Sequence, residues 1–210
     1  MKYCEKDFID QVRKILNTRE RRIIEQPPFA RAAVLVPLFK KGQDCNIVFT
    51  KRSDNVRYHK GEISFPGGVF DERDLELERT ALREADEEIG LKENDVQIIG
   101  VLDDIITVTQ FIVTPFVGLF PYPYPFKLSP VEIAELIEVP LSSLLGEDCF
   151  SEKEIIRGTR KEVVYAYQYE NHIIWGATAR ILKQFLDLIP LLGFRNEKNR
   201  NDPEGTNKGS

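Results

Sequence analysis

Three glutamates lie close together in the segment Arg83-Glu84-Ala85-Asp86-Glu87-Glu88-Ile89. On a helix, each residue advances by about 100°, so Glu88 and Glu87 lie about 40° and 60° from Glu84, on opposite sides. The carboxylates then share one face and repel one another, and Arg83 can relieve only part of that repulsion. A bound Mg²⁺ or Mn²⁺ would explain the pattern, because these ions prefer hard oxygen ligands. From the charges alone, a solvated acidic face remains the alternative.

The residues around this segment predict a helix over residues 75–89 that ends at Gly90. Leu82, Ala85 and Ile89 fall together on a face different from that of the glutamates, so this second face is expected to pack on a sheet. Directly upstream, the Pro66-Gly67-Gly68 sequence predicts a sharp change of direction beside the helix.

The remaining pattern predicts strands before and after the charged helix, an amphipathic helix at each end, and no internal repeat. The helices are expected at residues 8–16, 141–145 and 177–191, the strands at 32–38, 46–50, 96–102, 111–120, 132–139 and 163–169, and a short extended segment at 62–65. This order favours an α+β fold of the α/β/α sandwich type, with a mixed β-sheet between helices.

Length and composition indicate one globular domain. The chain has 210 residues, 42% apolar and 30% charged, with a net charge of −5, so no global basic field points to nucleic acid. The predicted organisation is a helical extension over residues 1–28, the main domain over 29–194 and a disordered polar tail over 195–210. Three scattered cysteines predict neither a disulfide framework nor a zinc site. No signal sequence or membrane-spanning run is visible, which favours the cytoplasm.

The segment from Arg83 to Leu91 resembles the R-E-U-x-E-E-x-G-U half of the Nudix box, where U is a bulky aliphatic residue. The front half of the box, G-x5-E-x7, differs here. Counting from Gly68, the acidic residue is Asp74 rather than glutamate, and one extra residue follows before Arg83. The resemblance implies a Nudix fold and a metal-dependent hydrolase of nucleoside diphosphate derivatives.

A second motif extends the resemblance upstream. Val48-Phe49-Thr50-Lys51-Arg52-Ser53, Arg57, Gly61 and Phe65-Pro66-Gly67-Gly68 resemble the L-L-T-x-R-[SA]-x3-R-x3-G-x3-F-P-G-G signature of the coenzyme A pyrophosphatases in the Nudix superfamily. Every spacing agrees, and Val48 and Phe49 replace the two leucines. Residues 174–182 are also similar to the terminal helix of that subgroup, so the resemblance covers about residues 30–190.

The resemblance implies roles for the residues of the box. Glu84 and Glu88 are the first candidates for ligands of Mg²⁺ or Mn²⁺, with Glu87 as a third ligand or a base. Arg83 is expected to orient Glu87. Phosphoryl transfer depends mainly on positioning and charge neutralisation, which this group can supply.

The upstream motif supplies candidates for substrate binding. Arg52 and Arg57 can grip phosphate through bidentate guanidinium contacts, although a structural ion pair is the alternative for one of them. Gly67 and Gly68 would let the backbone turn tightly beside the metal.

Three further residues admit two interpretations. Glu132 and Glu135 could supply a general base from a loop, but surface carboxylates are the favoured interpretation. Trp175 is interpreted as a core residue in preference to a residue that stacks on adenine.

The predicted function is hydrolysis of coenzyme A, or a derivative of it, to adenosine 3′,5′-bisphosphate and 4′-phosphopantetheine. Another Nudix substrate, such as NADH, ADP-ribose or a nucleoside triphosphate, is the first alternative. A Nudix module that senses a nucleotide without cleaving it is the second, and the complete set of box glutamates argues against it. The expected partner is a small nucleotide, with no nucleic acid or membrane, and the protein is expected to be a monomer or homodimer.

Overall fold

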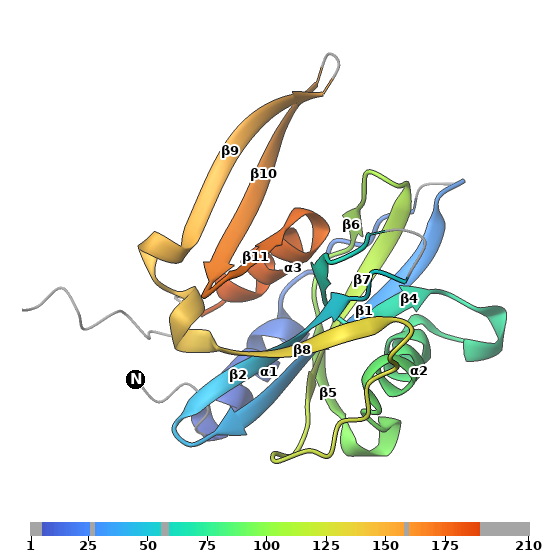
Figure 1. The fold of residues 1–210 in the computed structure, drawn as a ribbon, viewed down its shortest axis with the longest axis vertical. Coiled ribbons are helices and arrows are strands. Elements are labelled where there is room, and N and C mark those ends of the chain that lie inside the picture. Colours follow the sequence, from blue (N-terminus) through green and yellow to red (C-terminus); the bar gives the residue numbers. More distant parts are fainter. Residues whose placement is uncertain (1–5, 26–27, 56–58, 158–159, 190–210) are drawn as a thin grey trace, which may run out of the picture.

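The computed structural model describes residues 6–25, 28–55, 59–157 and 160–189 (Figure 1). Its α-helices are α1 (Lys6–Thr18), α2 (Leu77–Ile89) and α3 (Gly176–Leu186). Its strands are β1 (Ala30–Lys41), β2 (Asp44–Arg52), β3 (Ile63–Ser64), β4 (Gly67–Val69), β5 (Gln97–Val101), β6 (Ile105–Ile106), β7 (Phe111–Leu119), β8 (Ile133–Pro140), β9 (Phe150–Arg157), β10 (Arg160–Tyr169) and β11 (His172–Trp175). Short 3₁₀ helices lie at Glu72–Asp74, Glu93–Asp95, Leu141–Leu144 and Glu147–Cys149.

The main sheet is mixed and has β1 at its centre. Its strand order is β3-β2-β1-β7-β5, with β4 paired to β1, β6 to β7 and β8 to β2. The β1–β7 pair is parallel, whereas the other pairs are antiparallel. This topology places the start of β4 next to the middle of β1, where Gly67 pairs with Val34.

Side chains of β1 alternate between two apolar cores. Ala33, Leu35 and Phe39 belong to the core that contains Leu82, Ala85 and Ile89 of α2. Val36 and Leu38 point into the other core, which contains Phe8 and Val12 of α1 and Leu182 and Phe185 of α3. Because helices cover both faces of the sheet, a central strand must be apolar on both sides, as β1 is. The predicted α/β/α sandwich is confirmed, and so is the sheet-facing stripe of α2.

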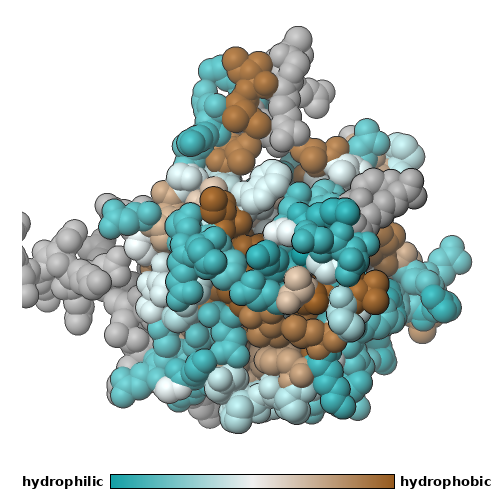
Figure 2. Space-filling view, in the orientation of Figure 1, coloured by the Kyte–Doolittle hydropathy of each residue, from teal (hydrophilic) through white to brown (hydrophobic). Residues whose placement is uncertain are grey.

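A second, three-stranded sheet lies beside the sandwich, in the order β11-β10-β9. The β9–β10 hairpin projects from the body of the molecule in Figure 1, and Figure 2 shows hydrophobic residues exposed along it. Ile156 on β9 is 75% exposed. Strand β9 was not predicted, because its sequence, rich in glutamate and lysine, lacks the apolar alternation of a half-buried strand.

Three predicted boundaries need correction. The charged helix begins at Leu77 instead of residue 75, because Asp71 caps a separate 3₁₀ turn at Glu72–Asp74. The last helix begins at Gly176 and ends at Leu186, short of residue 191. The first helix is also longer than predicted, at Lys6–Thr18. It packs Phe8 and Val12 into the main core, and the predicted polar tail lies outside the described residues.

Candidate active site

Glu88 is a buried carboxylate on α2. Only 4% of the residue is exposed, and its Oε2 atom is buried without a hydrogen-bond partner. Burial raises the pKa of Glu88 to about 8, and the charges of Glu84 and Glu132 add to that effect, whereas Arg52 and the backbone N–H of Gly67 oppose it. The nearest cation is Arg52, whose Nη1 lies 3.9 Å from Oε1. A buried carboxylate with an unpartnered oxygen is costly, so this position favours a cation that supplies the missing contact.

Glu84 lies one helical turn before Glu88 and is also partly buried, which raises its pKa despite the neighbouring Arg83. Its carboxylate packs directly against the backbone of β4. A Cβ on Gly68 would lie 2.4 Å from the carboxylate carbon and Oε1 of Glu84. A Cβ on Gly67 would instead lie 2.4 Å from the carbonyl oxygen of Ala33. The two glycines therefore serve different purposes: Gly68 makes room for the carboxylate, and Gly67 lets β4 pair closely with β1.

Arg83 joins three carboxylates into one network. Its Nη1 donates to Glu84 Oε1 at 2.8 Å and to Glu87 Oε2 at 3.1 Å. Its Nε and Nη2 donate to the two oxygens of Asp74 at 2.8 and 3.1 Å. This bidentate pairing fixes the plane of the guanidinium group, and it lowers the pKa of Asp74.

Asp74 holds this pairing from a buried position. Its Oδ2 also accepts from Thr80 Oγ1 at 2.8 Å and from the backbone N–H of Asp71 at 3.3 Å. The acidic residue of the front half of the box is thus occupied by contacts within the protein. Its contacts anchor Arg83.

Glu87 extends toward solvent, with 58% of its side chain exposed. In the described part of the chain, no group of three or more acidic, histidine or cysteine side chains is arranged to hold a metal ion. Glu84 and Glu87 both accept hydrogen bonds from Arg83, whereas the cation beside Glu88 is Arg52. On this helical face Glu88 is therefore buried and Glu84 partly buried, whereas Glu87 is largely exposed.

A loop after β7 caps the end of α2 and brings another carboxylate to the site. The N–H groups of Lys127 and Ser129 donate to the carbonyl oxygens of Ile89 and Glu88, each at 2.9 Å. These contacts satisfy carbonyls that a helix end leaves without partners. The loop then continues to Glu132, whose charge raises the pKa of both Glu84 and Glu88.

Glu132 and Glu135 have different surroundings, a difference that could not be predicted from their spacing. The backbone of Glu132 is held by the N–H of Ser53, which donates to its carbonyl oxygen at 2.8 Å. Glu135 faces elsewhere: its carboxylate lies 3.6 Å from Lys51 Nζ and 3.3 Å from His172 Nε2. Glu132 is therefore the loop carboxylate that belongs to the electrostatic surroundings of the box.

Arg52 connects these carboxylates to a cavity of about 650 Å³. The side chain is 29% exposed, its Nε is buried without a hydrogen-bond partner, and both Arg52 and Gly67 line the cavity. Buried donors without partners favour binding of an anion such as phosphate. Arg57, the second predicted phosphate-binding residue, lies outside the described residues.

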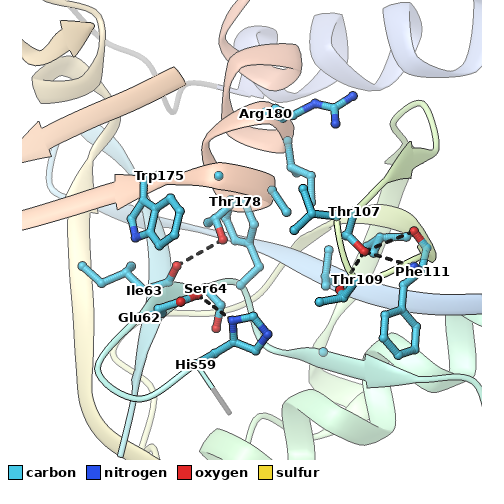
Figure 3. A pocket seen from close by; sticks show the side chains of 18 of the residues that line it. His59, Glu62, Ile63, Ser64, Thr107, Thr109, Phe111, Trp175, Thr178 and Arg180 are labelled. Atoms are coloured by element: carbon cyan, nitrogen blue, oxygen red, sulfur yellow. Dashed lines mark hydrogen bonds and ion pairs between the residues drawn. The ribbon is translucent and has the colours of Figure 1, made fainter. Parts of the chain in front are cut away.

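Segments that are far apart in the sequence build the cavity wall (Figure 3). Trp175 and Thr178 lie on one side, at the start of α3, and Thr107 and Phe111 lie on the other, at the turn between β6 and β7. Trp175 is 45% exposed and lines the cavity, so its interpretation as a core residue is wrong. Strand β11 alternates buried and exposed residues, which places Trp175 on the exposed face.

The comparisons with known proteins agree with this architecture. The NUDIX domain family model matches residues 28–156. This chain belongs to the Nudix family. The uncharacterized Nudix hydrolase NudL of Photorhabdus laumondii subsp. laumondii is 36% identical over 183 residues, which cover 87% of this chain and 96% of that protein. NudL of an Escherichia coli strain is 36% identical over 154 residues, 73% of this chain and 80% of its own length.

A solved structure shows the same fold at low sequence identity. A MutT/nudix family protein from Enterococcus faecalis superposes with a TM-score of 0.50 at 13% identity, covering 83% of this chain and 66% of that one. Together, the family match and the named relatives show that the protein is a Nudix hydrolase. None of its described helices is long and apolar enough to cross a membrane. Because the names of these relatives give no substrate, the choice of substrate rests on the residues of this chain.

Proposed function

We propose that this Nudix hydrolase cleaves the diphosphate of coenzyme A or a derivative of it, with Mg²⁺ or Mn²⁺ as its metal. The observation that carries the proposal is the position of Arg52. It lies 3.9 Å from the buried Glu88 carboxylate and also lines a cavity of about 650 Å³, which is large enough for a ligand of this class. Arg52 is also the first arginine of the motif that resembles the coenzyme A pyrophosphatases.

The residues of the site fit a divalent cation. Glu88 has a buried oxygen without a partner, Gly68 leaves room for the carboxylate of Glu84, and all of these donors are hard oxygens. Glu84 and Glu88 are the proposed ligands, and Glu87 is a third ligand or a base. The ion would supply charge neutralisation at the phosphate oxygens and activation of water.

The protein contributes orientation and charge. Arg83, fixed by Asp74, holds Glu84 and Glu87 in place through its Nη1. Arg52 is positioned to bind a phosphate oxygen of the substrate. Water adds to one phosphorus, the anhydride P–O bond breaks, and a proton is released. The products from coenzyme A are adenosine 3′,5′-bisphosphate and 4′-phosphopantetheine.

Glu132 is the proposed general base if Glu87 binds the metal. It comes from a different element than α2, so it can approach the attacking water from outside the helix. Its contribution to the pKa of Glu84 and Glu88 supports a position close to both. The interpretation as a surface carboxylate, favoured for both residues from the sequence, is kept for Glu135 alone.

The test is product analysis by mass spectrometry with coenzyme A, with and without Mg²⁺. We expect both predicted products only when the metal is present. Parallel assays with NADH, ADP-ribose and nucleoside triphosphates measure kcat/KM for the alternatives. A much higher kcat/KM for one of them would replace coenzyme A as the substrate, and no turnover of any would favour a sensing module. Cytoplasmic location and a monomeric or homodimeric state remain predictions.

A further inference from the structure

We propose that Asp104 is a positioning residue that fixes one wall of the cavity and thereby sets the affinity for substrate. Asp104 lies directly before β6, and this wall is formed by residues 106–109 and by Phe111 at the start of β7. It acts by connecting the wall to the segment at residues 19–25, which follows α1. The inference rests on the proposed function for the identity of the substrate, but not for the position of the wall.

The carboxylate of Asp104 is buried and paired with two arginines. Its side chain is 0% exposed. Oδ1 accepts from Arg21 Nη2 at 2.5 Å and from Thr114 Oγ1 at 2.7 Å. Oδ2 accepts from the N–H of Ile24 at 3.0 Å and from Arg31 Nη2 at 3.5 Å. Both oxygens have partners, and a buried charge of this kind constrains all of them, because the loss of one partner leaves the others unsatisfied.

The groups that meet at Asp104 come from separate parts of the chain. Arg21 and Ile24 belong to the segment after α1, whereas the other two partners are on β1 and β7. This segment forms neither helix nor strand at residues 20–25. The backbone N–H of Asp104 also donates to the carbonyl oxygen of Arg22 at 3.0 Å. The segment is therefore held at the start of β6 by its backbone as well as by its side chains.

Strand β6 depends on such a contact because it is only two residues long. It pairs with β7 through Ile105 and Ile106. The turn that follows, seen in Figure 3, is closed by the N–H of Thr107, which donates to the carbonyl oxygen of Phe111 at 2.9 Å. Val108 in this turn is 65% exposed, so core packing does not hold it. A segment with few backbone pairs and an exposed tip has low local stability, and its position depends on the groups at its ends.

The opposite wall of the cavity is connected to the same place. Arg180 on α3 donates through Nη1 to the carbonyl oxygen of Ile106 at 3.0 Å. Gln184, one turn further along α3, accepts through Oε1 from the N–H of Asp103 at 3.1 Å. Because α3 begins next to Trp175, which lines the other side of the cavity, these contacts set the separation of the two walls. A displacement of about 1 Å in a binding site is enough to weaken its function strongly.

The kinetic test separates positioning from a loss of folded protein. Asp104→Asn keeps the shape of the side chain and removes its charge. None of the partners of Asp104 named above is on α2, so the variant should bind substrate more weakly and leave the chemical step intact. We expect KM for coenzyme A with Mg²⁺ to rise about tenfold, with kcat within about twofold of the unmodified protein. A loss of folded protein would instead lower kcat and leave KM unchanged.

Two substitutions of Arg21 and one control complete the kinetic series. Arg21→Gln removes one of the two cations and serves as the test if Asp104→Asn does not fold. Arg21→Lys keeps the charge, so its KM should lie between those of Arg21→Gln and the unmodified protein. Arg13→Gln is the matched control, because Arg13 donates to Gln97 Oε1 at 3.0 Å on the surface beside α1, and its KM should not change.

Hydrogen exchange in the substrate-free protein measures the wall directly. Asp104→Asn, or Arg21→Gln in its place, should speed exchange of the amides at residues 105–111 by about tenfold or more and leave those of α2 unchanged. Unchanged exchange at these residues would overturn the inference, and so would an unchanged KM in a folded variant. If the unmodified protein cleaves no coenzyme A species, the proposed function fails, and the exchange rates alone decide whether Asp104 positions the wall.

Discussion

Replacement of Glu88 by glutamine should make the metal-free protein more stable and abolish its activity. Only 4% of Glu88 is exposed, and its Oε2 has no hydrogen-bond partner. Glutamine has nearly the same shape but no charge, so the variant avoids the cost of an ionised buried group. A residue that only supported the fold would show the opposite result, since most substitutions of buried residues destabilise.

The size of the effect follows from the pKa of Glu88, which burial raises from 4.5 to about 8. A raised carboxyl pKa means that the native state binds the proton more tightly than the unfolded state. Stability is therefore greatest below pH 4.5 and is lost as pH rises toward 8. Each pKa unit corresponds to about 1.4 kcal/mol, so the loss at pH 8 is at most about 5 kcal/mol. Because the buried site relaxes, we expect Glu88→Gln to recover about 2–4 kcal/mol at pH 8 and little at pH 5.

Thermal unfolding in the presence of a chelator measures this difference. For a chain of this length, about 2–4 kcal/mol corresponds to an increase in Tm of roughly 5–15 °C. Added Mg²⁺ should raise the Tm of the unmodified protein but not of Glu88→Gln, because only the native site binds the ion. Glu87→Gln is the matched control on the same helix, and its metal-free Tm should change little because Glu87 is largely exposed. A metal-free Glu88→Gln protein that melts below the unmodified protein at pH 8 would refute the burial argument, and retained stabilisation by Mg²⁺ would exclude Glu88 as a ligand.

The other predictions concern the groups around this carboxylate. Gly68→Ala should fold normally yet lose about tenfold or more in Mg²⁺ affinity, since its Cβ would displace the Glu84 carboxylate. Gly67→Ala should instead lower the free energy of unfolding, because its Cβ would meet the backbone of Ala33. Titration calorimetry and denaturation separate the two outcomes. Glu132→Gln should lower kcat by about 100-fold or more and Glu135→Gln should not, and equal kinetics would exclude Glu132 as the base. Asp74→Asn should lower the free energy of unfolding, measured in urea at pH 7, by about 1–3 kcal/mol. Because the pKa of Asp74 is lowered, that cost should shrink as pH falls below 3.8, and a cost independent of pH would contradict the ion pair.

The carboxylate helix could be predicted from sequence because its signals are local. The spacing of Glu84, Glu87 and Glu88 determines their face, and that of Leu82 and Ile89 determines the opposite packing surface. What spacing could not provide is the state of each carboxylate. Whether a glutamate on this face is exposed or buried depends on β4 and on the loop after β7, which approach α2 from distant parts of the sequence.

The role of Asp74 shows a second limit. It precedes Arg83 by nine residues, a separation that no single helix would bring into contact on one face. The pair forms because a 3₁₀ turn at Glu72–Asp74 interrupts the backbone before α2 begins. The capping residue Asp71 is a recognisable signal for such a turn, since aspartate favours the start of helices. The cavity offered no comparable signal, because residues from β6, β10 and α3 meet only in the folded chain.

The two proposed ligands have different energetic relations to an incoming cation. Glu84 already accepts a hydrogen bond from Arg83, which Asp74 holds in a fixed plane. To bind an ion, Glu84 must exchange one favourable contact for another, so its net gain is reduced. Glu88 has no contact to lose at Oε2 and carries the larger burial cost. If these glutamates bind the metal as proposed, neutralisation at Glu88 would provide most of the driving force, and Glu84 and its arginine would mainly determine where the ion is held.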